Sequence, residues 1–316
     1  MHHRSYNRLL IGVALLALVA VLGSNALQLA FHSGPTSVVT ADPELGWRFR
    51  GQRNQQEMGL ADFPLRFNAR GCRGPESTGD ESRGRTVFLG NSVTLGQHVP
   101  EDRTFASLAD GINAGGDGYD TYQQLRHFRC DLADLKPQRV VLMITATDLM
   151  TAAASRERMR STAAANPDLA PLLQRLTDIR QARRIFSHGF RPKGDDRPDP
   201  GRDNAYLAAA MAVPDPQVWR DWTTSIDGLA KEIGAGHLTL VLSPPRLQVL
   251  NCLPGTKETP LATALREFCS TRKIGFHDLL PDLAVANPQE LYCDHVHFSE
   301  RGHALVAEIL TRTGIR

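Results

Sequence analysis

The stretch Thr86–Leu95 reads TVFLGNSVTL, a short apolar run that breaks into Gly90-Asn91-Ser92. Such a run is typical of a buried strand that ends in a tight turn. It shows no polar alternation, as is typical of strands in a parallel sheet covered on both faces. Ligands in such sheets bind beyond the carboxyl ends of the strands. We therefore expect Ser92 to be presented at the functional edge of an α/β sheet.

Outward from this stretch, strand and helix patterns alternate, which predicts the α/β class with a mostly parallel, five-stranded sheet. Thr86–Leu89 is the first strand. The other strands are expected within Ala106–Asn113, which also contains a helix end, and at Arg139–Ile144, His237–Leu242 and Gly275–His277. Helices are expected at Asp120–Leu132, Gln217–Ile233, Pro260–Thr271 and Ser299–Thr311, the last with Ser299 as its N-cap.

The domain at residues 86–316 is interrupted by a long insertion at about 150–216. The insertion includes a helix candidate, Leu169–Gln181, and a basic, Gly/Pro-rich region, Arg183–Asn204. A segment of this length is either a lid or polar substrate surface, or a solvated loop.

A second informative segment, CDHVHFSERGH at Cys293–His303, places Asp294 three residues before His297. A serine at a strand end, with a base and a carboxylate that orients the base, is what nucleophilic acyl transfer requires. The pattern predicts Ser92 as nucleophile, His297 as general base and Asp294 as its orienting partner. The alternative is a metal site, because Asp294, His295, His297 and His303 are all ligand types.

The N-terminus carries an uncharged apolar segment, Leu9–Phe31, preceded by Arg4 and Arg8. About 20 apolar residues span a bilayer, and basic residues stay on the cytoplasmic side. We expect residues 1–8 in the cytoplasm, a signal anchor at 9–31 and a juxtamembrane segment and linker at 32–85. The juxtamembrane segment is expected to hold short strands at Gly46–Phe49 and Pro64–Asn68, and a polar linker follows at Pro75–Arg85. The alternatives are a cleaved signal peptide with its site near Ser24-Asn25-Ala26, and a buried helix.

Composition excludes some classes of protein. A net charge of +2 over 316 residues gives no electrostatic reason to expect nucleic acid as a partner. The five cysteines include no CxxC pair, which argues against a zinc knuckle. An exported domain permits disulfides, and Cys252 with Cys269 is a candidate pair, while the odd number leaves at least one cysteine unpaired.

These motifs resemble those of the SGNH hydrolase superfamily, the GDSL-type esterases and lipases, over about residues 86–316. Block one of the family is Gly-Asp-Ser, and here it is Gly90-Asn91-Ser92. Block two, an Asn followed by an oxyanion-binding glycine, is matched by Asn113 and Gly118, and block five, Asp-x-x-His, by Asp294 and His297. The segment Asp42–Glu76 is similar to the lead-in of membrane-anchored bacterial members.

Block three departs from the family. The family has Gly-x-Asn-Asp, whose Asn side chain is a third oxyanion donor, whereas this chain has Thr145-Ala146-Thr147-Asp148. Thr147 therefore occupies the Asn position, with a shorter side chain. Loss of one oxyanion donor costs about 10²–10³ in kcat. The resemblance implies an oxyanion hole made by the N–H groups of Ser92 and Gly118, with Thr147 as a weaker third member.

The resemblance implies an α/β/α sandwich with a flavodoxin-like sheet and a Ser-His-Asp serine esterase or acylhydrolase that needs no metal or organic cofactor. The expected substrate is an ester-bearing small molecule, lipid or acylated glycan, such as an O-acetylated envelope glycan. The expected place is the periplasmic side of the inner membrane, held by the N-terminal helix. The alternatives are an envelope-polysaccharide O-acetyltransferase that uses the same site, and a degenerate, non-catalytic envelope-binding or assembly protein of the same fold.

Overall fold

The computed structural model describes residues 39–42, 46–49, 65–76, 83–149, 200–253 and 257–315. The chain divides into two units, Met1–Thr40 and Ala41–Arg316, and nearly all of the described residues belong to the second. Within the described ranges, none of the helices combines the length and apolar character that crossing a membrane requires. The predicted anchor Leu9–Phe31 lies outside the described residues and stays a prediction, as does the helix at Leu169–Gln181.

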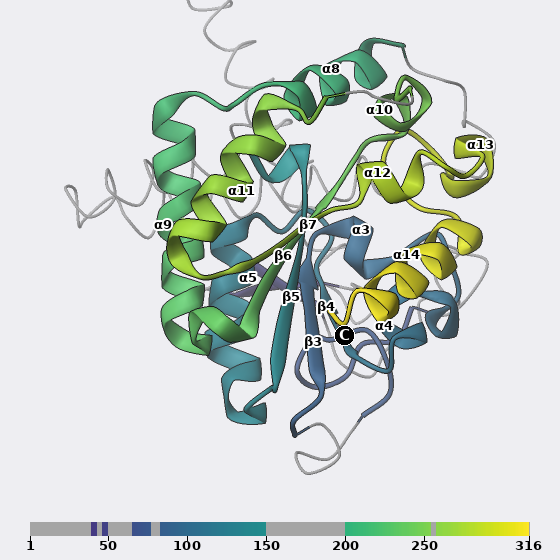
Figure 1. The fold of residues 1–316 in the computed structure, drawn as a ribbon. Helices are drawn as coiled ribbons and strands as arrows, with labels where there is room; N and C mark the ends of the chain where they lie inside the picture. Colours follow the sequence, from purple (N-terminus) through teal and green to yellow (C-terminus); the bar gives the residue numbers. More distant parts are fainter. Residues whose placement is uncertain are drawn as a thin grey trace, which may run out of the picture. The chain divides into compact units, whose positions relative to one another are not determined.

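The core of the second unit is a five-stranded sheet whose paired strands are all parallel. The strand order is β4-β3-β5-β6-β7, which is the flavodoxin-like order, with the first strand between the second and the third. The predicted α/β class and five-stranded parallel sheet are therefore confirmed (Figure 1). The strands are β3 (Thr86–Gly90), β4 (Ile112–Gly115), β5 (Arg139–Thr145), β6 (Leu238–Ser243) and β7 (Gly275–Asp278).

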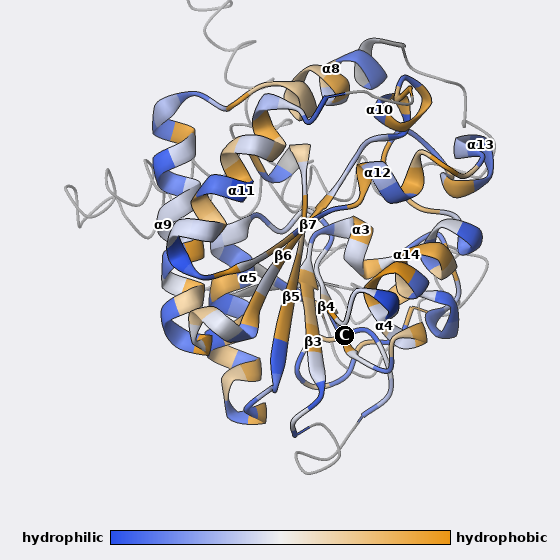
Figure 2. Ribbon diagram, in the orientation of Figure 1, coloured by the Kyte–Doolittle hydropathy of each residue, from blue (hydrophilic) through white to orange (hydrophobic). Residues whose placement is uncertain are grey.

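The central strands are buried along almost their whole length, as the continuous apolar runs predict. Val87–Leu89 and Val140–Ile144 are fully buried, and apolar colour fills the middle of the molecule (Figure 2). The range Ala106–Asn113 contains, as predicted, the end of a helix, α4 (Phe105–Leu108), and the start of the edge strand β4. The strand runs over Ile112–Gly115 and so ends two residues later than expected.

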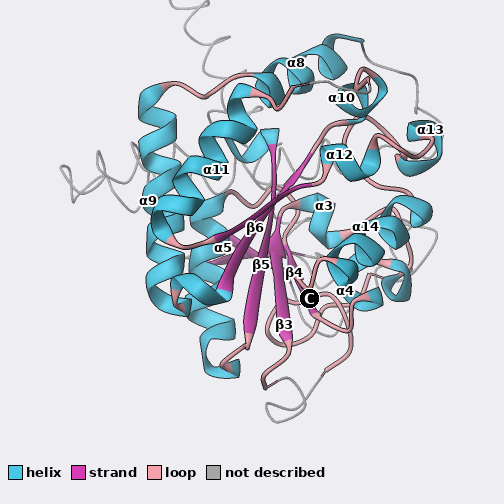
Figure 3. Cartoon of the chain, in the orientation of Figure 1, coloured by secondary structure: helices cyan, strands magenta, loops and turns pink. Residues whose placement is uncertain are grey.

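Helices cover both faces of the sheet (Figure 3). One face packs against α5 (Thr121–His127), α9 (Pro216–Ile233) and α11 (Pro260–Arg272), with Trp222 completely buried among them. The other face packs against α3 (Ser92–Leu95), α4, α10 (Arg246–Leu250), α12 (Leu280–Leu283), α13 (Pro288–Leu291) and α14 (Glu300–Arg312). The result is the expected three-layer α/β/α arrangement.

The predicted helices are confirmed within a residue or two at most ends. Ser299 caps α14 as expected, since its side chain accepts from the Gly302 N–H at 3.2 Å. The predicted Asp120–Leu132 helix starts with a capping box at Asp120 and continues beyond α5 as a π-helix over Phe128–Leu132. Sequence reasoning missed α8 (Pro200–Met211), whose first residues were assigned to the loop Arg183–Asn204. The rest of that loop lies outside the described residues.

The segment before the sheet contains the predicted strand Gly46–Phe49 but not the predicted strand Pro64–Asn68. β1 (Val39–Asp42) and β2 (Gly46–Phe49) form a two-stranded sheet. The predicted strand Pro64–Asn68 is wrong: among its described residues, only Phe67 makes an isolated antiparallel bridge, to Arg73, across a tight turn in which Gly71 has φ 74°. Arg73 in turn bridges to Asn113, so the open edge of β4 holds this turn in place of a regular strand.

The structure describes all five cysteines and places none of them in a disulfide, so the candidate Cys252–Cys269 pair is wrong. The sheet separates the two residues. Cys269 is buried in the core on the α11 face, whereas Cys252 packs against the core on the α14 face.

Candidate active site

The turn after β3 is built to present Ser92. Gly90 has φ 155°, and a Cβ there would lie 2.1 Å from Thr94 Oγ1 and 2.9 Å from the Met143 carbonyl oxygen. Asn91 then caps α3, its side-chain oxygen accepting from the Val93 N–H at 3.0 Å. Ser92 is the first residue of α3 and is half-buried, so part of the residue is exposed to solvent.

The loop between α13 and α14 brings the base to this serine. His297 Nε2 lies 2.8 Å from Ser92 Oγ, although the two residues are 205 positions apart. His297 Nδ1 lies 2.7 Å from Asp294 Oδ2. The other oxygen of Asp294 accepts from the Val296 and His297 N–H groups, each at 2.8 Å. The structure therefore places the three predicted residues in contact. His297, the base, lies between the nucleophile Ser92 and the orienting carboxylate Asp294.

The charge state of Asp294 suits this role. Burial acts to raise its pKa, but the charge of His297 and the hydrogen bonds from its ring and backbone outweigh burial, and hold the pKa well below its usual range. Asp294 is therefore ionised at neutral pH, and an ionised carboxylate orients the imidazole and stabilises its protonated form.

A buried polar network lies behind the serine turn. Asn91 Nδ2 donates to Asp148 Oδ2 at 2.9 Å and to Thr145 Oγ1 at 2.8 Å. Asp148 also accepts from the Thr145 N–H at 2.8 Å, the Thr145 hydroxyl at 3.0 Å and Gln124 Nε2 at 3.1 Å. Burial raises the pKa of Asp148 to about 6, although the hydrogen bonds from Thr145 and Gln124 act to lower it.

This network explains why Asn91 can stand at the position where block one of the SGNH hydrolases has Asp. Asp148 accepts four hydrogen bonds and pairs with no cation among those contacts. A carboxylate at position 91 would face Asp148 at 2.9 Å in place of the amide donor. Two carboxylates at that distance cannot both be ionised without a large cost. The amide of Asn91 therefore complements the carboxylate of Asp148.

The expected oxyanion donors all follow carboxyl ends of strands. The Ser92 N–H belongs to the first turn of α3, where N–H groups have no intrahelical acceptor. Gly118 follows β4 in an exposed loop with φ 69°, and its backbone interacts with the half-buried Asp117 carboxylate. Thr147 lies in a 3-10 helix, Ala146–Leu149, directly after β5, and its side chain lies outside the described part of the chain.

Arg73, which the sequence analysis did not select, binds the C-terminal end of α3, the helix that begins at Ser92, and the loop after it. Its buried guanidinium donates to the Leu95 carbonyl at 2.8 Å, to that of Gly96, and to the Val99 carbonyl at 2.6 Å. Burial lowers the pKa of Arg73 to about 10, so it stays charged at neutral pH. No sequence pattern near Arg73 signals these contacts, because its partners lie 22–26 residues away.

The metal alternative is not assembled as the sequence suggested. His303 is buried, its Nδ1 accepts from the Phe105 N–H at 3.2 Å, and burial lowers its pKa to about 3. Gly302 beside it admits no side chain, because a Cβ would lie 2.1 Å from the Leu291 carbonyl oxygen. Among the described residues, the group with metal-ligand spacing is instead His98, Asp294 and His297.

A doubly wound sheet with a Ser-His-Asp triad at the carboxyl end of its first strand can carry out nucleophilic acyl transfer. No family model matches the chain, and no curated protein matches it. Solved structures similar to the chain are named as acylhydrolases, GDSL-like lipases and esterases.

Three of these solved structures align with 72–76% of this chain. A lipase/acylhydrolase from Enterococcus faecalis is 15% identical, with a TM-score of 0.41 over 72% of this chain and 94% of the other. A GDSL-like lipase from Bacteroides thetaiotaomicron is 15% identical, with a TM-score of 0.35 over 76% and 91%. A mutant acetyl-xylooligosaccharide esterase from Geobacillus stearmophilus is 13% identical, with a TM-score of 0.37 over 73% and 94%.

Proposed function

We propose that this chain is a serine esterase of the SGNH type that cleaves a carboxylic ester through an acyl-enzyme. The observation that carries the proposal is the continuous chain of contacts from Ser92 Oγ to His297 Nε2 at 2.8 Å and from His297 Nδ1 to Asp294 at 2.7 Å. A complete triad with an accessible serine favours a hydrolase over the non-catalytic envelope-binding alternative.

In the first half of the reaction, Ser92 Oγ attacks the ester carbonyl carbon while His297 Nε2 takes the hydroxyl proton. The negative charge on the carbonyl oxygen is stabilised by the N–H groups of Ser92 and Gly118, with Thr147 as a third donor. His297 then gives its proton to the leaving alcohol, and the acyl group stays on Ser92. Water, deprotonated by His297, attacks the acyl carbon, the bond from that carbon to Ser92 Oγ breaks, and His297 returns the proton to Ser92 Oγ as the acid is released.

The substrate we propose is an ester carried on the cell envelope, such as an O-acetyl group on a glycan. This part rests on the N-terminal sequence, in which Arg4 and Arg8 precede the uncharged segment Leu9–Phe31. A single-pass anchor in the inner membrane would keep the triad on the periplasmic side. Protease digestion of intact spheroplasts tests this placement: the domain should be digested from outside, and protection of the domain would contradict it.

The test of the chemistry is labelling of the full-length chain with a fluorophosphonate probe, which forms a covalent bond only with an activated serine. We expect one label, at Ser92, and none in Ser92→Ala or His297→Ala, with hydrolysis of a small activated ester lost in parallel. A folded chain that neither labels nor turns over would contradict the proposal. Acetate transferred to an added glycan hydroxyl in place of water would assign the same site to an acetyltransferase.

A further inference from the structure

His98 lies beside the catalytic base, in the loop that follows α3. Its ring centroid is 4.8 Å from that of His297, at an interplanar angle of 54°. One ring nitrogen of each histidine and one carboxylate oxygen of Asp294 lie within 4.8 Å of one another. His98 is exposed and the other two residues are half-buried, so a solvated ion can reach the group.

Two imidazoles and one carboxylate are a ligand set that Zn²⁺ takes in proteins, with a fourth position left for water. In a tetrahedral site, zinc–ligand bonds of about 2.0–2.2 Å place two donors about 3.3–3.6 Å apart. The widest separation in the group, 4.8 Å, therefore has to shorten by about 1.2–1.5 Å. His98 can supply this movement, because it is an exposed side chain on a loop.

We propose that His98, His297 and Asp294 form a site for a divalent transition-metal ion, Zn²⁺ above all, and that the ion reversibly switches off the triad. Both nitrogens of His297 are engaged in the triad, Nδ1 with Asp294 and Nε2 with Ser92. Coordination through Nδ1 breaks the bond that orients the imidazole, and coordination through Nε2 removes the acceptor of the serine proton. Metal binding and catalysis therefore exclude each other.

Zn²⁺ binding at this site does not depend on the proposed function. Inhibition of the triad by Zn²⁺ rests on the proposed esterase activity. Zn²⁺ binding is measured first, on the full-length chain by competition with a chromophoric chelator. We expect one Zn²⁺ per chain in the wild type and in Ser92→Ala, which has no turnover but keeps all three ligands. His98→Ala should bind at least tenfold more weakly.

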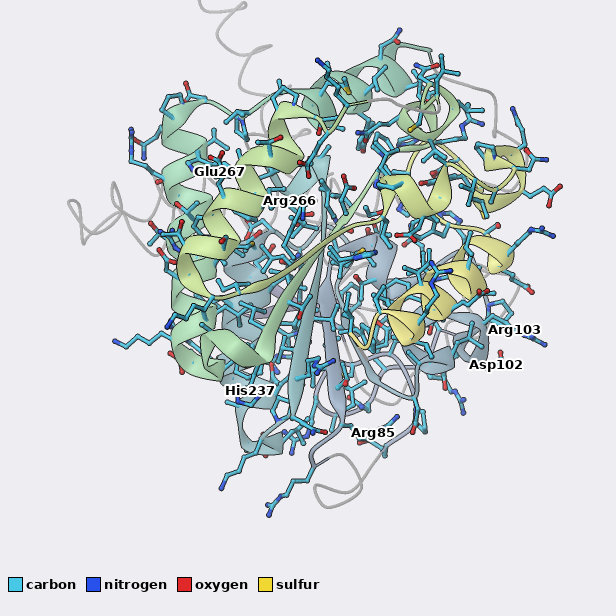
Figure 4. The ribbon with its side chains drawn as sticks, viewed as in Figure 1. Arg85, Asp102, Arg103, His237, Arg266 and Glu267 are labelled. Atoms are coloured by element: carbon cyan, nitrogen blue, oxygen red, sulfur yellow. The ribbon has the colours of Figure 1, made fainter. Side chains whose placement is uncertain are left out.

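The matched control is His237→Ala, because His237 is also exposed but lies before β6, at the amino ends of the strands (Figure 4). It should bind Zn²⁺ as the wild type does. Equal binding by His98→Ala and the wild type would overturn the site, whether or not the enzyme is active.

Cobalt substitution separates this site from binding at the exposed thiols of Cys130 and Cys293. Co²⁺ held by nitrogen and oxygen gives visible d–d absorption without a thiolate charge-transfer band in the near ultraviolet. Such a band would place the ion on a cysteine and overturn the assignment.

In the active chain, we expect Zn²⁺ to block fluorophosphonate labelling, a chelator to restore it, and His98→Ala to resist the block. A chain that binds Zn²⁺ through His98 but is fully active when loaded would contradict the switch and leave the esterase proposal standing. A chain that binds Zn²⁺ through His98 but never labels would contradict the esterase proposal and leave the metal site standing.

Discussion

Asn91 donates through Nδ2 to the buried carboxylate of Asp148 over 2.9 Å, so the residue before the nucleophile is tied to the residue three positions beyond the end of β5. The same Asn91 caps the serine helix through its side-chain oxygen. The Asn91 side chain thus links the carboxyl ends of β3 and β5 and fixes the turn that carries Ser92.

Replacing Asn91 with Asp should destabilise the domain. The change removes an amide donor and sets two buried carboxylates against each other, so one of them must hold a proton. We expect a loss of about 2–3 kcal/mol in the free energy of unfolding at pH 7, measured by urea denaturation, and a lower kcat/KM. The double variant Asn91→Asp/Asp148→Asn restores an amide–carboxylate pair and should recover much of the loss. A single variant as stable as the wild type would show that the network does not hold the turn.

Asp294→Asn should leave the fold intact and reduce kcat by about 10³–10⁴, because an amide cannot hold the imidazole in the required tautomer or stabilise its charge. Ester hydrolysis under saturating substrate measures the effect. The matched control is Asp282→Asn, which alters a similar pair, His277 Nε2 to Asp282 at 3.0 Å, outside the triad. Equal rates for the two variants would remove Asp294 from the mechanism.

Arg73→Met should cost about 3 kcal/mol of stability, because it leaves the carbonyls of Leu95, Gly96 and Val99 without a charged donor. We also expect a loss of kcat/KM, since these carbonyls belong to the last residue of α3, its C-cap and the loop that follows. The control is Arg66→Met in the same segment, where an exposed ion pair with Glu101 is removed. Exposed pairs contribute about 0–1 kcal/mol, so comparable melting temperatures for the two variants would contradict the role of Arg73.

His303 should make the protein sensitive to acid. Burial lowers its pKa from 6.5 to about 3. Between these two pH values, the histidine is protonated in the unfolded chain and neutral in the native chain. The stabilisation is therefore complete above about pH 6.5 and is lost as the pH falls toward 3. His303→Asn keeps an acceptor for the Phe105 N–H and removes this titration. Between pH 6.5 and 4 its unfolding free energy should fall by about 3 kcal/mol less than that of the wild type. Parallel curves for the two proteins would assign the acid sensitivity to other groups.

Much of the fold follows from local pattern. The runs TVFL and RVVLMI are apolar at consecutive positions, and only a strand covered on both faces buries every side chain of such a run. The ends of helices were equally readable, because Asp120 and Ser299 cap helices through contacts within three residues. The errors fell at Pro64–Asn68 and α8, where short or polar segments are shaped by what they pack against.

For the candidate site, local sequence is enough to predict the residue types and their placement at the ends of elements. A serine follows a strand, and Asp294 is close enough to His297 for one loop to carry both. The distant groups that contact them depend on the packed fold. The Arg73 contacts with the serine helix, the Asn91–Asp148 bond and the approach of His98 to His297 join residues far apart along the chain. Such contacts depend on how the layers pack, which leaves no periodicity or spacing in the sequence.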